Sequence, residues 1–158
     1  MTAIRNNRAR KTGFTLIEIL IVVIILGILA AIVIPQFSSA SNDARKSNVQ
    51  TTVQTLRSQI ALYKLQHQDA LPDLITDWKP LTLKTDATGS TTPAAGVQTF
   101  GPYMQDTPVN SLNSLSTVVH GDGTAPAAAS VGFMYDYAAG TGSGKIWGTD
   151  VDGKTLIP

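Results

Sequence analysis

The chain falls into three stretches according to its pattern of apolar and polar residues. A polar leader, residues 1–13, is followed by 21 residues, Phe14 to Ile34, that are apolar apart from Thr15 and Glu18. As a helix, this stretch would be about 31 Å long, which matches the hydrocarbon thickness of a bilayer. A secretory signal peptide would have a shorter apolar core and a small-residue cleavage site. The pattern therefore predicts a helix that stays in the membrane.

A helical pattern continues beyond the apolar stretch. No Gly or Pro occurs between Pro35 and Pro72, and apolar residues recur there at alternating spacings of four and three. This spacing places them on one face of an amphipathic helix, which Leu62 and Leu65 would widen. We therefore expect one continuous helix from residue 14 to about residue 68. The apolar face that we expect to pack in the core consists of Val49, Val53, Leu56, Ile60 and Tyr63.

The region after Pro72 is expected to form a small sheet with long loops. Residues 131–137 alternate in polarity and residues 145–149 follow across a Gly-rich connection, so the two segments predict a β-hairpin. Residues 81–84 are a further candidate strand. The predicted fold class is α+β, with one long N-terminal helix packed on a small antiparallel β-sheet. Small residues mark three expected surface loops, residues 85–99, 120–130 and 138–144.

The distribution of charge predicts the orientation of the membrane helix. Four basic residues and no acidic residue precede Phe14, whereas the chain from Ser38 onward has eight basic and ten acidic residues. A basic segment before an apolar span stays in the cytoplasm, so we expect the C-terminal region to be translocated. The near-neutral remainder lacks the electrostatic signature of a nucleic-acid-binding protein. The chain has no cysteine, which excludes disulfides and thiolate metal sites.

No catalytic residue is predicted. The two histidines, His67 and His120, fall at a helix end and in a Gly-rich loop. Neither has the spacing of a zinc site or of a nucleophile with its base. We therefore expect a structural protein rather than an enzyme.

The carboxylate of Glu18 is the unusual feature of the apolar stretch. An ionised carboxylate in hydrocarbon is costly unless it has a partner of opposite charge. A positively charged group one helical turn away, on the same chain or on a neighbouring copy, would be such a partner. The alternative is that Glu18 reaches the headgroups at the end of a plain membrane anchor. The whole junction, KTGFTLIE at residues 11–18, favours the first interpretation.

This junction and the apolar segment after it resemble the processing site of the type IV pilin superfamily. The shared features are a basic leader, a Gly before the cut, an aromatic first mature residue and a Glu fifth after the cut. The resemblance implies cleavage between Gly13 and Phe14 by a prepilin peptidase, followed by N-methylation of Phe14. It also implies that Glu18 is the carboxylate needed for assembly into a helical filament.

Gly27 and Pro35 are candidates for flexibility in the helix. Gly is a weak helix former, and Pro35 lacks a backbone donor and clashes with the carbonyl group of Ala31. In related filaments, the segment between a matching Gly and Pro is where the helix can lose its regular form on assembly. The alternative is that Pro35 only kinks the helix where it leaves the membrane.

A candidate calcium site lies near the C-terminus. Asp150 and Asp152 are two residues apart, before Gly153, and alternating carboxylates near a Gly turn can chelate calcium. Major pseudopilins of type II secretion systems, which this chain resembles, have a C-terminal loop that binds calcium. The alternative is an exposed Asp-Gly turn, because two aspartates do not supply six ligands.

Within the superfamily, the sequence favours a major pseudopilin of a type II secretion system. The chain lacks the disulfide loop that pilins of adhesive pili often carry, and residues 100–113 (FGPYMQDTPVNSLN) look like a run found in many pseudopilin-like proteins. One alternative is a type IV pilus subunit for adhesion, motility or DNA uptake. Another is a monomeric membrane-anchored binding domain outside the cytoplasm.

The resemblance also implies partners, location and domain organisation. The subunit would cross the bacterial inner membrane once, with its C-terminal domain in the periplasm. In that membrane it would meet the prepilin peptidase and the assembly platform, and it would then enter a filament with its own copies and other pseudopilins. We expect a leader at 1–13, a membrane and filament-core helix at 14–37, its amphipathic continuation at 38–71, and a β-region at 72–158 that completes the globular head with 38–71.

Overall fold

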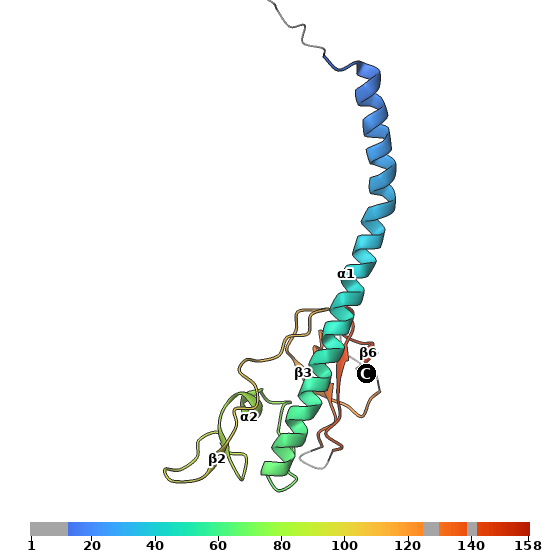
Figure 1. Ribbon diagram of the computed structural model, residues 1–158. Coiled ribbons are helices and arrows are strands. Elements are labelled where there is room, and N and C mark those ends of the chain that lie inside the picture. Colours follow the sequence, from blue (N-terminus) through green and yellow to red (C-terminus); the bar gives the residue numbers. More distant parts are fainter. Residues whose placement is uncertain (1–12, 125–129, 139–141) are drawn as a thin grey trace, which may run out of the picture. The chain divides into compact units, whose positions relative to one another are not determined.

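The computed structural model describes residues 13–124, 130–138 and 142–158 (Figure 1). The chain forms two compact units, Met1–Ala40 and Ser41–Pro158. The boundary between them falls within the long helix α1 (Leu16–Gln66), so each unit contains a part of that helix. We call the second unit the head.

Helix α1 has 51 residues and confirms the predicted helix to within two residues at either end. It remains helical through Pro35, and the Ser39 hydroxyl donates to the Pro35 carbonyl oxygen at 3.1 Å. The helix ends where Gln68 and Asp69 adopt positive φ angles of 54° and 64°. There the Asp69 amide donates to the Lys64 carbonyl oxygen at 2.9 Å, which satisfies one of the last helical carbonyl groups.

The described part of the first unit, from Gly13 onward, has no apolar core of its own. Large apolar side chains from Phe14 to Phe37 are between 45% and 84% exposed. By length and composition, this part of α1 could cross a membrane, and none of its most apolar window is buried. Within the described residues, the apolar side chains of this part of α1 therefore have no neighbours that bury them.

The head is organised around the opposite arrangement. All five residues of the predicted apolar face of α1 are buried, which confirms that prediction. The expected widening of this face is wrong, because Leu62 is 41% exposed and Leu65 is 81% exposed. Each lies two positions beyond a buried residue, Ile60 or Tyr63. Two positions correspond to about 200° around a helix, so both leucines point away from the core.

A four-stranded sheet packs against the head portion of α1. The predicted hairpin is confirmed by antiparallel pairing between Phe133–Tyr135 and Ile146–Thr149. The sheet is mixed rather than purely antiparallel, because its first strand pairs in parallel. Its order is β3 (Val118–His120), β4 (Phe133–Tyr135), β5 (Ile146–Thr149) and β6 (Leu156–Ile157).

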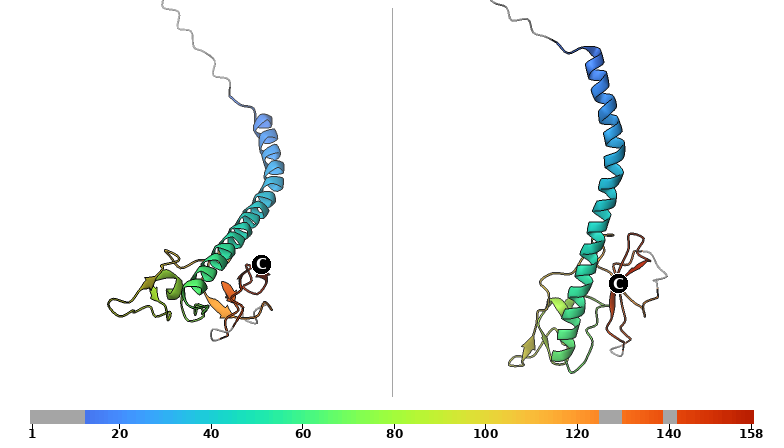
Figure 2. Two further views of the ribbon diagram at one scale, coloured as in Figure 1. Left: turned by 60° about the horizontal axis from the view of Figure 1, so that its bottom comes forward. Right: turned by 45° about the vertical axis from the view of Figure 1, so that its right-hand side comes forward.

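The segment between α1 and this sheet contains a short helix and two short strands. The expected strand at 81–84 is wrong: the chain forms α2 (Lys79–Thr82), with Pro80 in the first turn, where a missing amide is harmless. β1 (Thr85–Asp86) and β2 (Thr99–Phe100) pair at the two ends of the expected 85–99 loop. This segment and the four-stranded sheet lie on different sides of the head portion of α1 (Figure 2). Parts of the other two expected loops, 125–129 and 139–141, lie outside the described residues.

A close approach sets the distance between β5 and α1, and a buried amide holds the loop before β3 against the sheet. A Cβ atom on Gly148 would lie 2.3 Å from Val49 Cγ1, so only glycine allows β5 this near α1. The side chain of Asn110 is fully buried and its Nδ2 donates to the carbonyl oxygens of Gly132 and Thr149, at 2.8 and 2.7 Å. This amide ties the loop before β3 to β4 and β5.

The core combines residues of α1, the middle segment and the sheet. Beyond the α1 face, its members are Leu71, Leu74, Trp78, Leu81, Leu112, Phe133, Tyr135, Ile146 and Ile157.

Candidate functional site

The N-terminal junction is built around a reciprocal hydrogen-bonded cap at the start of α1. Glu18 Oε2 accepts hydrogen bonds from the Thr15 amide at 2.7 Å and from the Thr15 hydroxyl at 2.8 Å. The Thr15 Oγ1 atom accepts in turn from the Glu18 amide at 3.3 Å. Thr15 is the residue just before α1, and Glu18 is the third residue of the helix. This arrangement is a capping box, which satisfies two amides that the helix itself leaves unpaired.

Thr15 is a functional candidate that our reading of the sequence did not single out. The signal was present, because Thr-x-x-Glu before an apolar run is the local signature of a capping box. In the uncut chain, the Glu18 carboxylate therefore has partners of its own. A new amine at Phe14 would lie directly beside the residue that holds this carboxylate.

The two residues at the predicted cut are accessible. Gly13 and Phe14 precede α1 in non-helical backbone, and the Phe14 side chain is 84% exposed. A Cβ atom on Gly13 would meet no other atom within 4 Å. A peptidase needs accessible backbone outside a helix, and this part of the chain provides it.

Gly27 and Pro35 both lie inside regular helix. A Cβ atom on Gly27 would meet nothing within 4 Å, so contacts within the chain do not require glycine at that position. The helical backbone passes through Pro35 without a break. Flexibility between the two residues stays a prediction about the assembled state.

Asp150 and Asp152 both lie at the turn between β5 and β6. Asp150 Oδ1 accepts from the Val151 amide at 2.7 Å, and Asp152 Oδ1 accepts from the Lys154 and Thr155 amides at 2.8 and 2.9 Å. No group of three or more acidic or histidine side chains that could hold a metal occurs in the described parts of the chain. Both aspartates are thus engaged by hydrogen bonds within their own turn.

The histidines have structural surroundings. His67 is 1% exposed, its ring stacks on Tyr63 at 3.7 Å between centroids, and its nitrogens contact the Tyr63 carbonyl oxygen and the Thr85 hydroxyl. A carbonyl oxygen can only accept, so Nδ1 donates to Tyr63; the Thr85 hydroxyl can serve Nε2 as either donor or acceptor. His120 is exposed at the end of the edge strand β3.

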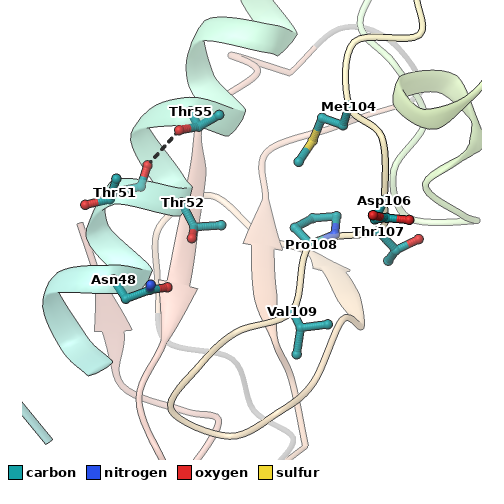
Figure 3. Close-up of a pocket in the computed structure, with 9 residues that line it drawn as sticks. All are labelled: Asn48, Thr51, Thr52, Thr55, Met104, Asp106, Thr107, Pro108 and Val109. Carbon is teal, nitrogen blue, oxygen red and sulfur yellow. Dashed lines mark hydrogen bonds between the residues drawn. The ribbon is translucent and has the colours of Figure 1, made fainter. Parts of the chain in front are cut away.

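A shallow groove of about 330 Å³ lies between α1 and the segment 104–109 (Figure 3). Its helix side is formed by uncharged side chains, and the hydroxyls of Thr51 and Thr55 donate to carbonyl oxygens of their own helix. Asp106 is the one charged residue of the lining. The lining combines no nucleophile with a base, so we assign no chemistry to this groove. Its members are Asn48, Thr51, Thr52, Thr55, Met104, Asp106, Thr107, Pro108 and Val109.

Comparison with known proteins identifies the class of this junction. Residues 8–34 match the family model described as the prokaryotic N-terminal methylation motif. The matched residues include the basic leader, the Gly13–Phe14 bond, Glu18 and most of the exposed apolar part of α1. The chain therefore carries the N-terminal segment of proteins with this motif.

The particular relatives are components of secretion systems and pili. The chain is 42% identical over 60 residues to type II secretion system core protein G of Pseudomonas aeruginosa, covering 38% of this chain and 42% of the relative. It is 44% identical over 57 residues to type IV narrow pilus major component PilA5 of Thermus thermophilus, covering 36% and 49%. For type II secretion system core protein G of Vibrio cholerae the identity is 38% over 58 residues, covering 37% and 40%.

These matches confirm the predicted resemblance to pilins and major pseudopilins. The chain spans less than half the length of each of these curated relatives, 42%, 49% and 40% respectively. No solved structure is significantly similar to the chain. The fold described above, one long N-terminal helix on small mixed and antiparallel sheets, is an α+β fold of the pilin-like kind.

Proposed function

We propose that this chain is a structural subunit of a helical filament, cut between Gly13 and Phe14 by a prepilin peptidase and N-methylated on Phe14. The observation that carries the proposal is the pairing of an accessible junction with an apolar helix that has no partners of its own. Such a helix needs an apolar environment both before and after assembly. A bilayer supplies it first, and neighbouring copies of the same helix supply it in the filament.

Glu18 is the assembly residue in this proposal. Before cleavage, Thr15 satisfies its carboxylate within the chain. After cleavage, the Phe14 α-amine of a neighbouring copy offers a charged partner. A charged pair in low dielectric is stronger than a hydrogen bond to a neutral donor. The exchange of partners would favour the packed filament and set the register between helices.

Among filaments, we favour the pseudopilus of a type II secretion system. The support comes from the absence of cysteine and from the similarity to several core G proteins. The subunit would first cross the inner membrane with its head in the periplasm. It would then be passed by an assembly platform into a filament that contains other pseudopilins. A type IV pilus subunit is the second candidate, because PilA5 matches over a similar segment.

The test is to produce the full chain with and without a prepilin peptidase and to measure the intact mass. We expect loss of residues 1–13 and the gain of one methyl group only when the active peptidase is present. A Gly13→Val variant should keep its leader and serve as the control. A chain that still begins before Phe14 in the presence of the active peptidase would contradict the proposal. It would favour a permanently anchored binding domain instead.

A further inference from the structure

The turn between β5 and β6 is closed by hydrogen bonds within its own backbone. The Gly153 amide donates to the Asp150 carbonyl oxygen at 2.9 Å, and Gly153 adopts a positive φ of 67°, which favours glycine. The Asp150 amide donates to the Thr155 carbonyl oxygen at 2.8 Å across the base of the turn. The backbone of this turn is therefore closed without any external group.

Asp152 is the side chain that organises the turn. Its Oδ1 atom accepts from the amides of Lys154 and Thr155, and its Oδ2 atom accepts from the Thr155 hydroxyl at 2.9 Å. Both carboxylate oxygens of Asp152 thus accept hydrogen bonds from within the turn. Calcium takes six to eight oxygen ligands, whereas this carboxylate is engaged by the amides and the hydroxyl of its own turn.

The same device recurs at other turns of the head. An Asp carboxylate accepts from both the amide and the hydroxyl of one Ser or Thr a few residues later; we call this pair a clamp. A clamp closes the local chain with two hydrogen bonds to one Ser or Thr residue. An Asx turn closes it with a single hydrogen bond. Within the described residues, the clamps are Asp73–Thr76, Asp86–Thr88, Asp122–Thr124, Asp136–Ser143 and Asp152–Thr155.

We propose that the Asp152–Thr155 clamp replaces calcium in this chain, so that the head folds and keeps its C-terminal turn without a metal ion. The head has no cysteine, and its loops are fastened by clamps where other extracytoplasmic domains use disulfides or metals. In this proposal, the Asp152 carboxylate that the sequence offers as a calcium ligand serves instead to bind Thr155. The inference concerns the head alone and does not rest on the proposed filament function.

The experiment measures the thermal midpoint of the full-length protein in detergent micelles, by near-ultraviolet circular dichroism, in millimolar calcium and in EDTA. We expect the two midpoints of the unaltered protein to agree within about 1 °C, whereas a site filled by calcium would raise the midpoint by several degrees. Asp152→Ala and Thr155→Val should lower it by about 2–5 °C in both conditions alike.

Asp152→Asn separates the clamp from a metal site. The amide keeps an oxygen that accepts from the backbone and can still bond the Thr155 hydroxyl, but it lacks the charge that calcium needs. We therefore expect Asp152→Asn to lower the thermal midpoint by less than half as much as Asp152→Ala does. Asp43→Asn, an exposed position on α1, is the matched control. A midpoint that calcium raises by more than about 3 °C, with the rise abolished by Asp152→Asn, would overturn the inference.

Discussion

The two units of this chain differ in where their apolar side chains find contacts. In the head, Val49, Leu56 and the rest of one α1 face are buried against the sheet. In the first unit, the same helix exposes about half or more of nearly every large apolar side chain from Phe14 to Phe37. One helix therefore contains a part that the chain stabilises by itself and a part that requires another molecule.

This difference explains why the two regions use opposite sequence patterns. The head portion of α1 has one apolar face, because one side of it packs into the core and the opposite side is exposed. The first part is apolar all round, which is typical of a helix surrounded by lipid or by other helices. Substitutions in the head should therefore alter folding, and substitutions near the junction should alter processing and assembly.

The largest expected effect on stability comes from the buried face of α1. Leu56 is fully buried, and Leu56→Ala should lower the free energy of unfolding of the head by about 2–5 kcal/mol, because it removes apolar contacts and leaves a cavity. Leu65→Ala is the matched control on the same helix, and at 81% exposure it should change that free energy by less than about 0.5 kcal/mol. Urea unfolding in detergent measures both; equal losses would contradict the assignment of the faces.

A smaller effect is expected where the sheet meets the helix most closely. Gly148→Ala would place a methyl group 2.3 Å from Val49 Cγ1, and we expect a loss of about 1–3 kcal/mol from the resulting strain. Val49→Ala removes the atom that clashes. The double variant should therefore be more stable than the sum of the single losses predicts. Additive losses in the same urea experiment would show that this contact does not set the distance between β5 and α1.

The smallest expected effect is a loss of stability in acid, confined to the head. Hydrogen bonds from Thr88, Thr124 and Ser143 lower the pKa values of Asp86, Asp122 and Asp136 below the usual range of an aspartate. Because the folded pKa values lie below the unfolded value of about 3.9, the stabilisation is complete above that pH. It is lost as the pH falls through the folded values.

Thermal midpoints at several pH values between 7 and 3 check this expectation. These aspartates should leave the thermal midpoint unchanged between pH 7 and about pH 4. Below about pH 4 the midpoint should fall. Thr88→Val removes the hydroxyl that contributes most to the lowered pKa of Asp86, so this variant should show a shallower acid loss. An identical acid profile in the variant and the unaltered protein would contradict the role of the clamp.

The sequence predicted the elements whose cause is local. The length of α1, its buried face and the β4–β5 hairpin follow from residue spacing and turn composition, and each was found. The parallel pairing of β3 with β4 and the buried amide of Asn110 depend on contacts between residues far apart in the chain. No local pattern reports such contacts.

The candidate site divides in the same way. The junction at Gly13 and Phe14 lies in a short linear segment that the methylation-motif family model also matches, so residue types alone could point to it. The capping role of Thr15 is equally local, because it depends only on the three-residue spacing between its hydroxyl and Glu18. The calcium prediction at Asp152 rested on residue types alone. The folded chain adds that neighbouring amides and the Thr155 hydroxyl bond to the same carboxylate, which residue types alone do not show.

The measurement that tests the central claim most directly is the fraction of cleaved subunit found in sheared filaments for the Glu18→Gln variant. Gln can still form the capping box with Thr15 but carries no charge. If Glu18 acts by pairing with the Phe14 amine of a neighbouring copy, Glu18→Gln should be cleaved normally, keep a folded head and remain in the membrane fraction, as Glu18→Ala should. Filaments formed by Glu18→Gln at the level of the unaltered chain would show that Glu18 only caps its helix, and would contradict the account.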